Sequence, residues 1–357
     1  MPVSASVIHQ RCLVHVRLDA RAREARPRLT LSAAAAALLG QHESGPRRLQ
    51  VVNAARLLSA GEKAGSNLAQ AGFICLATIA VDNRLPPFEA VWEGELGPGG
   101  PELGRFYLDL LFPAPGSGLA VVVAPSALFA YYFTSVSFAG TADILLHAPH
   151  EGASSDPAAE EYTGALAVTL GERAVALARV RGLSLGVTAV YPRAWRWGRF
   201  PAGLSRQTVD LARASGESEP LKHTHPPLVS NVNPSYQPVR EAYHALLRRY
   251  PRAAVAVHGL GSWHPEAFIF GLGVAEDYRL TPSERATLEE LLGRCFGEQF
   301  PWRIGRWGKE DARLAAGPIW EVGYAIRLDE ERRRRFAEAG AALLVAMVEA
   351  GLLTPRA

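Results

Sequence analysis

From about residue 140 the sequence alternates short apolar runs with segments that favour helices. The runs ADILL, LGVTAVY, AAVAVHGL, EAFIFGLGV and PIWEVGYAIR are typical of buried strands. A capping box from Thr281 to Glu284, with proline at the first helical position, predicts a helix that extends to Cys295. Pro238 begins another amphipathic helix, and a third closes the sequence. Strands that alternate with helices predict an α/β domain whose functional site lies at the carboxyl ends of the strands.

Residues 1–135 have a different character. They combine short alternating runs such as CLVHVRL and RFYLDLL with the alanine-rich segment LSAAAAALL and the turn-rich tract GELGPGGPELG. A chain of 357 residues is long enough for two domains. We therefore predict a smaller N-terminal domain of α+β or β-rich type and unknown role over 1–135, followed by the α/β domain over 136–357.

Composition restricts the partners of the protein. Its 38 Lys and Arg against 35 Asp and Glu leave a net charge of +3, too small to indicate a nucleic-acid partner. The uncharged stretch from Leu110 to Ala142 is interrupted by proline and glycine, so we expect buried strands there and no membrane span. The start of the sequence does not resemble a signal peptide, and the cysteines, Cys12, Cys75 and Cys295, are widely spaced. A cytoplasmic location is expected, and the oligomeric state stays open.

Histidines concentrate in one third of the chain. Seven of the ten fall between residues 147 and 264, namely His147, His150, His223, His225, His244, His258 and His264. His150 ends the run ADILLHAPH and His258 ends AAVAVH. Two neighbouring parallel strands would bring both imidazoles to the same edge of a sheet, where they could bind a metal ion.

A catalytic zinc ion commonly has two histidines and a carboxylate as protein ligands. Asp156 is one candidate for the carboxylate, although Asp-Pro is also a good helix start, and Glu151 and Glu160 are the alternatives. His223 and His225, together with His264, offer a second possible site. The prolines that follow His225 instead favour a surface loop for the first two histidines. We expect His244 to be exposed, off the apolar face of its helix.

Four segments carry a resemblance to a known family. PHEG at 149–152, then DPAAEEYTGALAVTL, AVAVHGLGSWHPEAFIFGLG and GPIWEVGYAIR resemble, in order, the motifs of N-formylglutamate amidohydrolases. More distantly, the chain is similar to zinc metallocarboxypeptidases and poly-γ-glutamate hydrolases. The resemblance covers about residues 140–350. It implies a mixed, mostly parallel sheet flanked by helices, similar to the fold of zinc carboxypeptidases. It also implies that His150, Asp156 and His258 bind Zn²⁺ and that Glu321 is the general base.

The sequence departs from the family pattern where the substrate carboxylate is expected to bind. The family carries Asn-Arg there, whereas this chain has SNVNPSYQP, with proline in place of arginine. Candidates for substrate binding are Asn231, Asn233, Arg306 and Arg327, with Arg303, Arg193, Arg196 and Arg199 as further arginines.

The residues and the resemblance together predict a zinc-dependent amidohydrolase. It would cleave the C–N amide bond of a small N-acylated amino acid, similar to N-formylglutamate. One alternative is a carboxypeptidase-like hydrolase of peptidoglycan or γ-glutamyl peptides. The other is a catalytically degenerate binding module, which would hold no stoichiometric metal. The expected partner is a small-molecule or peptide substrate.

Overall fold

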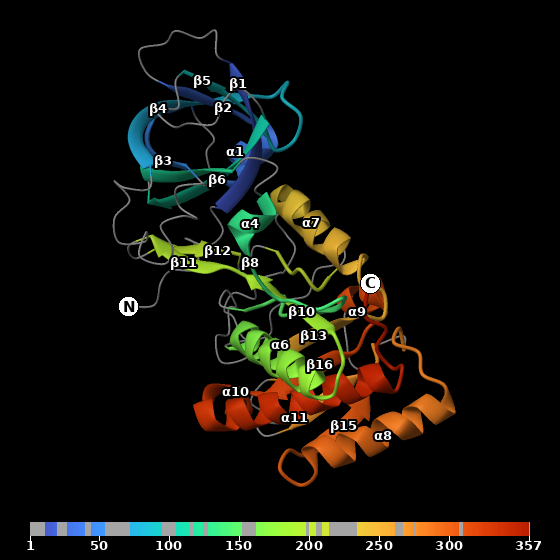
Figure 1. The fold of residues 1–357 in the computed structure, drawn as a ribbon. Helices are drawn as coiled ribbons and strands as arrows, with labels where there is room; N and C mark the ends of the chain where they lie inside the picture. Colours follow the sequence, from blue (N-terminus) through green and yellow to red (C-terminus); the bar gives the residue numbers. More distant parts are fainter. Residues whose placement is uncertain are drawn as a thin grey trace. The chain divides into compact units, whose positions relative to one another are not determined.

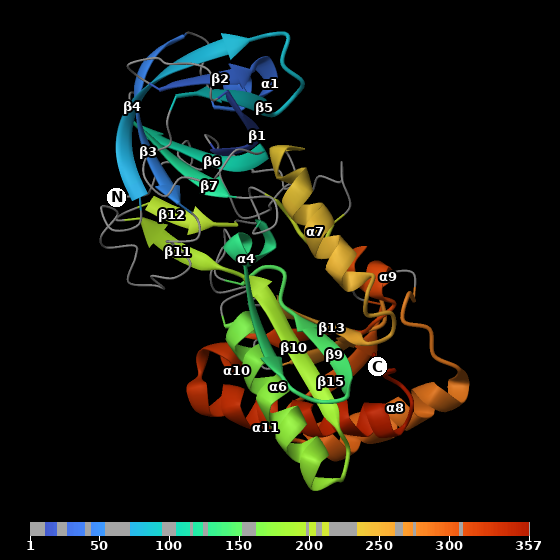
Figure 2. The ribbon, with the colours of Figure 1, turned by 45° about the horizontal axis from the view of Figure 1, so that its top comes forward.

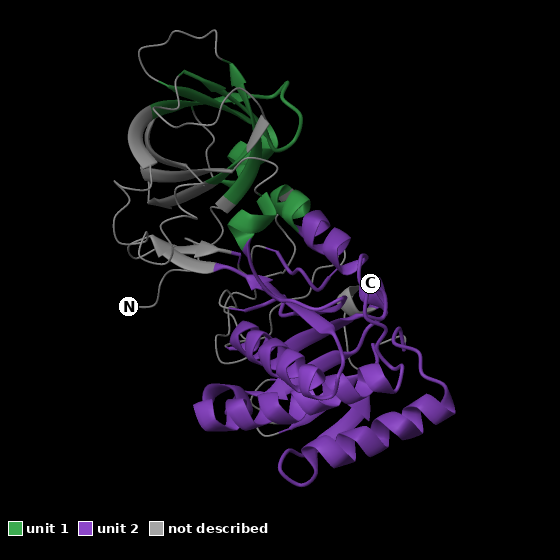
Figure 3. Cartoon of the chain, viewed as in Figure 1, with its two compact units in different colours: residues 1–132, 195–203, 232–239 green, residues 133–194, 204–231, 240–357 purple. Residues whose placement is uncertain are grey.

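The structure, a computed structural model, describes residues 11–19, 27–39, 44–53, 72–94, 105–114, 117–123, 128–151, 162–197, 200–204, 209–213, 234–260, 267–273, 276–306 and 310–356. The chain divides into two compact units (Figure 3). Unit 1 contains Met1–Tyr132, Trp195–Gly203 and Val232–Val239, and unit 2 contains the remaining residues.

Unit 1 is built on a closed β-barrel (Figure 1). Its strands are β1 (Arg11–Asp19), β2 (Arg28–Ser32), β3 (Gly45–Asn53), β4 (Gly72–Asp82), β5 (Glu89–Glu93), β6 (Arg105–Ala114) and β7 (Ser117–Val123), in the spatial order β1-β5-β2-β4-β3-β7-β6. The expected β-rich N-terminal part is confirmed. The alternation in RCLVHVRLD places Cys12, Val14 and Val16 in the core of this unit. Helix α1 (Ala33–Leu38) covers this core and begins at Ser32, whose Oγ accepts from the backbone of Ala35.

Further elements of unit 1 come from distant parts of the sequence. They are α4 (Leu128–Tyr132), most of the small sheet of β11 (Ala194–Trp197) and β12 (Phe200–Gly203), and the 3-10 turn η4 (Pro234–Tyr236). The buried carboxylate of Asp109 accepts hydrogen bonds from the hydroxyls of Tyr132, at 3.0 Å, and Tyr236, at 2.8 Å. These bonds tie α4 and η4 to strand β6.

The Cys12 thiol supplies a test of the barrel core. Burial raises its pKa from 9.0 to about 12, because the thiolate would lose its hydration in the apolar interior. At pH 9 the folded protein should therefore hold roughly 500-fold less Cys12 thiolate than the unfolded chain. We expect iodoacetamide at pH 9 to alkylate Cys12 at least about 500-fold more slowly in buffer than in 8 M urea, measured by peptide mass spectrometry. Equal rates in the two solvents would contradict this burial.

Unit 2 is built on a mixed sheet with the strand order β15-β14-β16-β13-β9-β10-β8. The strands are β8 (Phe133–Phe138), β9 (Ala142–His147), β10 (Leu185–Pro192), β13 (Ala254–Leu260), β14 (Phe268–Gly271), β15 (Trp302–Gly305) and β16 (Ile319–Gly323). The neighbours β10, β9, β13 and β16 run parallel, and β8 runs antiparallel to β10. At the other edge β14 runs antiparallel to β16 and parallel to β15. The predicted mixed, mostly parallel α/β sheet is confirmed.

The helices of unit 2 follow the sequence signals with one correction. They are α6 (Thr163–Val180), the larger part of α7 (Gln237–Leu247), α8 (Pro282–Phe296), α9 (Glu310–Ala315), α10 (Tyr324–Leu328) and α11 (Glu330–Glu349). The capping box at Thr281 is present. The run PIWEVGYAIR was expected to be one strand, but it turns into α10 after Gly323. The pairing of β16 with β13 ends there, opposite Leu260, and the following backbone groups form helical hydrogen bonds instead.

The uncharged stretch from Leu110 to Ala142 contains the end of β6, then β7, α4 and β8. Strands were expected there, and β7 and β8 confirm the expectation, whereas Leu128–Tyr132 is helical. Within the described ranges, no helix combines the length and apolar character needed to cross a bilayer.

The two faces of the unit 2 sheet differ in chemistry. One face is apolar and packs against α6, α8 and α11 (Figure 2); its members include Ile144, Leu146, Val255, Val257, Phe268, Phe270, Trp320 and Val322. Because side chains alternate along a strand, the residues between these point to the opposite face. That face carries His147, His258 and Glu321 on β9, β13 and β16. We call it the polar face.

Candidate functional site

The polar face brings a histidine and a glutamate side by side. His258 of β13 and Glu321 of β16 are register partners in adjacent parallel strands. Both side chains therefore project from the same face of the sheet. His258 is 1% exposed and Glu321 is 6% exposed, so the carboxylate that sequence analysis assigned as a base lies in a nearly dry environment.

His150 joins this pair from the neighbouring strand. Strand β9 ends at His147, not at His150 as expected, and His150 follows in a buried turn. The imidazole centroids of His150 and His258 are 5.1 Å apart and the ring planes cross at 72°. Strands β9 and β13 are parallel neighbours, so the predicted meeting of the two imidazoles at one edge is confirmed. Their role as zinc ligands stays a prediction.

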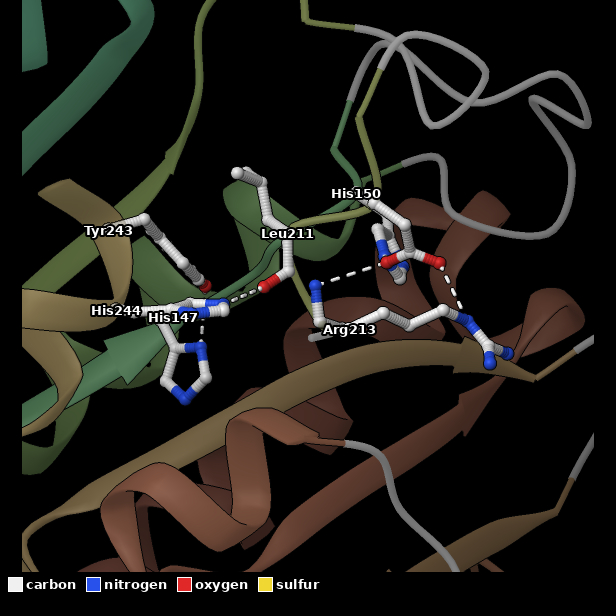
Figure 4. Close-up of polar contacts among 8 residues, drawn as sticks. His147, His150, Leu211, Arg213, Tyr243 and His244 are labelled. Carbon is white, nitrogen blue, oxygen red and sulfur yellow. Dashed lines mark hydrogen bonds and ion pairs between the residues drawn. The ribbon is translucent and has the colours of Figure 1, made fainter. Parts of the chain in front are cut away.

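His150 contacts a carboxylate that the sequence pattern does not indicate, that of Asp210. Nε2 of His150 lies 2.8 Å from Oδ1 of Asp210, whose side chain is completely buried. Asp210 also accepts from the backbone of Ala212 at 3.0 Å and from Nε of Arg213 at 3.1 Å, a chain of contacts that Figure 4 shows. The only hint in the sequence is an isolated acid in the apolar run VDLA.

Helix α7 contributes two further contacts near this face (Figure 4). The hydroxyl of Tyr243 lies 2.7 Å from Nδ1 of His147. Nε2 of His244 lies 2.8 Å from the carbonyl oxygen of Leu211, the residue after Asp210. The expectation that His244 is exposed was wrong, since it is 7% exposed. A backbone carbonyl gives its imidazole a buried partner, which helical periodicity cannot reveal.

Glu151, one alternative metal ligand, lies at the N-terminus of α6. Its Oε2 accepts from Oγ1 of Thr163 at 3.0 Å and from the backbone of Gly164 at 2.6 Å. Burial raises the pKa of this carboxyl, and the bond from Gly164 and the charge of Arg327 partly oppose that rise. These contacts are those of a helix-capping acid.

The two candidate arginines occupy different environments. Arg327 is completely buried, and its Nε donates to the carbonyl of Val322 at 2.9 Å. The Arg306 side chain is 73% exposed and pairs with Glu276 at 2.8 Å. Neither contact involves a residue of the polar face.

Several predicted site residues fall outside the described ranges. They are Asp156, Glu160, His223, His225, Asn231, Asn233 and His264. Among the residues that the structure does describe, no group of three or more His, Cys, Asp or Glu side chains is placed to hold a metal ion. The described part of the site is therefore a pair of imidazoles with Glu321 in register beside one and Asp210 bonded to the other.

Comparisons with known proteins give distant structural similarities. No protein-family model and no curated protein matches the sequence. A gene product of Agrobacterium tumefaciens is 14% identical, with a TM-score of 0.40, over 62% of this chain and 99% of the other. A metallo-carboxypeptidase from Burkholderia cenocepacia is 13% identical, with a TM-score of 0.33, over 70% and 78%. An N-acetylmuramyl-L-alanine amidase from Mycobacterium smegmatis is 12% identical, with a TM-score of 0.30, over 59% and 98%. At these TM-scores the likeness assigns neither a family nor an activity.

Proposed function

We propose that this protein is a zinc-dependent amidohydrolase that cleaves the C–N bond of a small N-acylated amino acid. His150 and His258 would bind Zn²⁺, and Glu321 would act as the general base. The observation that carries the proposal is the cluster of these three buried side chains at the carboxyl edge of the parallel strands. Ligand sites of open α/β sheets commonly lie at this edge.

The spacing of the imidazoles fits a shared metal ion. Zinc lies about 2.0–2.1 Å from a histidine nitrogen, and tetrahedral geometry then sets two ligating rings roughly 5 Å apart between centroids. The observed separation is 5.1 Å. The third ligand in this proposal is Asp156, with Glu160 as the alternative. Glu151 fits less well because its Oε2 is engaged at the N-terminus of α6.

The chemistry follows from the positions of the chain's own groups. When bound, zinc would polarise the scissile carbonyl and make a water molecule more acidic. Glu321 would accept a proton from the water while the water oxygen forms a bond to the carbonyl carbon. As the C–N bond breaks, Glu321 would return that proton to the leaving nitrogen.

Asp210 serves in this proposal as a positioning residue. A carboxylate on one imidazole nitrogen fixes the ring's tautomer and orientation and leaves the other nitrogen for a metal. We expect Asp210→Asn to weaken zinc affinity about 10–100-fold, measured by competition with a chromophoric chelator. Asp109→Asn, which alters a buried carboxylate in unit 1, should leave zinc affinity unchanged. Unchanged affinity in Asp210→Asn would remove Asp210 from the site.

A substrate panel tests the function itself. Zinc-loaded protein would be assayed for amine release from N-formyl-L-glutamate and other N-acylated amino acids, and in parallel from γ-glutamyl dipeptides and peptidoglycan stem peptides. The proposal predicts the highest kcat/KM for the small acylated amino acids. A higher kcat/KM for either peptide class would replace it with the carboxypeptidase-like reaction, and no hydrolysis of any compound would favour a binding module.

A further inference from the structure

Unit 1 has a pocket of its own. The pocket lies on the outer surface of the barrel, beside β1, β5, β6 and the start of α7, and its volume is about 260 Å³. Typical ligand pockets measure about 300–1,000 Å³, so this one suits a small compound or a single side chain. The described residues that line it all belong to unit 1 and include Leu13, His15, Phe88, Glu89, Tyr107 and Gln237.

Three side chains form a row along one wall of the pocket. His15 of β1 is the register partner of Tyr107 in β6 and of Glu89 in β5. Strand β1 lies between these two strands, so the three side chains project side by side from the outer face of the barrel. The rings of His15 and Tyr107 are stacked, with centroids 5.1 Å apart and planes at 23°. A phenol ring, an imidazole and a carboxylate therefore lie next to one another.

Hydrogen bonds hold the neighbouring parts of the pocket in place. Phe88 has a φ of 60°, which is uncommon for a residue with a bulky side chain. Its backbone N–H donates to Oγ of Ser32 at 2.9 Å, and its carbonyl accepts from the backbone N–H of His15 at 2.8 Å. The backbone N–H of Leu13 donates to Oγ of Ser235 at 3.0 Å, which joins β1 to η4. The turn that carries Phe88 and the segment before α7 are therefore both fixed to β1.

The lining favours a positively charged ligand with apolar substituents. The rings of Phe88 and Tyr107 have electron-rich faces, which attract organic cations. Of the described residues that line the pocket, Glu89 is the only acid and none is lysine or arginine. Arg17 does contact Glu89 at 3.3 Å, but its side chain is 47% exposed, so water and salt weaken this pair. A carboxylate accepts from more than one partner, so Glu89 can also face a cation in the pocket.

We propose that this pocket binds a small organic cation that carries an alkylated ammonium group. Phe88 and Tyr107 would contact the alkyl groups, and the carboxylate of Glu89 would neutralise the charge. Aromatic side chains recognise quaternary ammonium groups in this way in many proteins. The site contains no residue of the polar face, so binding there requires neither zinc nor the proposed hydrolysis.

Choline and its uncharged isostere 3,3-dimethyl-1-butanol test the proposal on the whole chain. Their affinities would be measured by ligand-observed NMR at constant ionic strength and pH 8, where an ordinary imidazole is mostly uncharged. We expect choline to bind at least about tenfold more tightly than the alcohol. Glu89→Gln, and separately Tyr107→Leu, should reduce this ratio at least about threefold. The control Glu93→Gln, which changes an acid of the same strand that pairs with Arg28, should preserve it.

Equal affinities for choline and the alcohol, or no saturable binding of choline, would overturn the proposal. An unchanged ratio in both site variants would overturn it as well, and Glu89→Gln alone decides if Tyr107→Leu fails to fold. A third ligand, Nα-acetyl-Nε-trimethyllysine amide, distinguishes the source of the cation. Tighter binding of this amide than of choline would support the site and identify a peptide side chain, whereas weaker binding would support the site and identify a free compound.

Discussion

Glu321→Gln should lower kcat about 10²–10⁴-fold, the usual contribution of a general base. Glutamine has nearly the same shape but cannot accept the proton of the attacking water. Because Glu321 is the proposed base and not a zinc ligand, the variant should retain the zinc content of the wild-type protein. The measurements are kcat on the best substrate of the panel and metal content by elemental analysis.

Glu276→Gln is the matched control for this variant, because Glu276 forms an exposed ion pair with Arg306. We expect its kcat to equal that of the wild-type protein. Full activity in Glu321→Gln would sink the proposed mechanism. Lost activity together with lost zinc would instead make Glu321 part of the metal site.

Phe268→Ala should have the largest effect on stability. Its side chain is completely buried, and its ring lies 4.7–5.4 Å from the rings of Phe296, Phe336 and Trp320. Removing a buried phenylalanine costs about 3–5 kcal/mol through lost burial and the cavity that remains. Hydrogen exchange of peptides from β13 and β16 in increasing urea would measure the loss in unit 2.

Leu328→Ala serves as the control for this second variant, because Leu328 is 41% exposed. Its free energy of unfolding should stay within about 0.5 kcal/mol of the wild-type value. If Phe268→Ala costs less than about 1 kcal/mol, the aromatic cluster is not the centre of the core that the structure describes.

The parts of the fold that the sequence predicts are those set by signals within a few neighbouring residues. The capping box at Thr281 and the alternating run RCLVHVRLD act within a few residues, and both give the expected element. The segment after Gly323 shows the limit of such signals, because short apolar runs suit strands and helices equally. Closure of the barrel depends on pairings such as β1 with β5 and β3 with β7, which no local pattern encodes.

The part of the candidate site that lies near strand ends could be predicted from the sequence. His150 and His258 each end an apolar run, and parallel pairing brings them together. Asp210 was missed because its contact with His150 joins residues that are 60 positions apart. The burial of Arg240 could not be predicted for a related reason. On a helix wheel it is one polar residue among several, and only the packing of α7 shows that it is buried.

Zinc content tests the central claim most directly. Protein purified without a histidine tag would be analysed for metals beside His150→Ala, His258→Ala and the control His15→Ala, which alters a barrel histidine in unit 1. The account predicts about one zinc ion per chain in the wild-type protein and in His15→Ala, and its loss in both site variants. A wild-type protein that holds no zinc after incubation with the metal would contradict it.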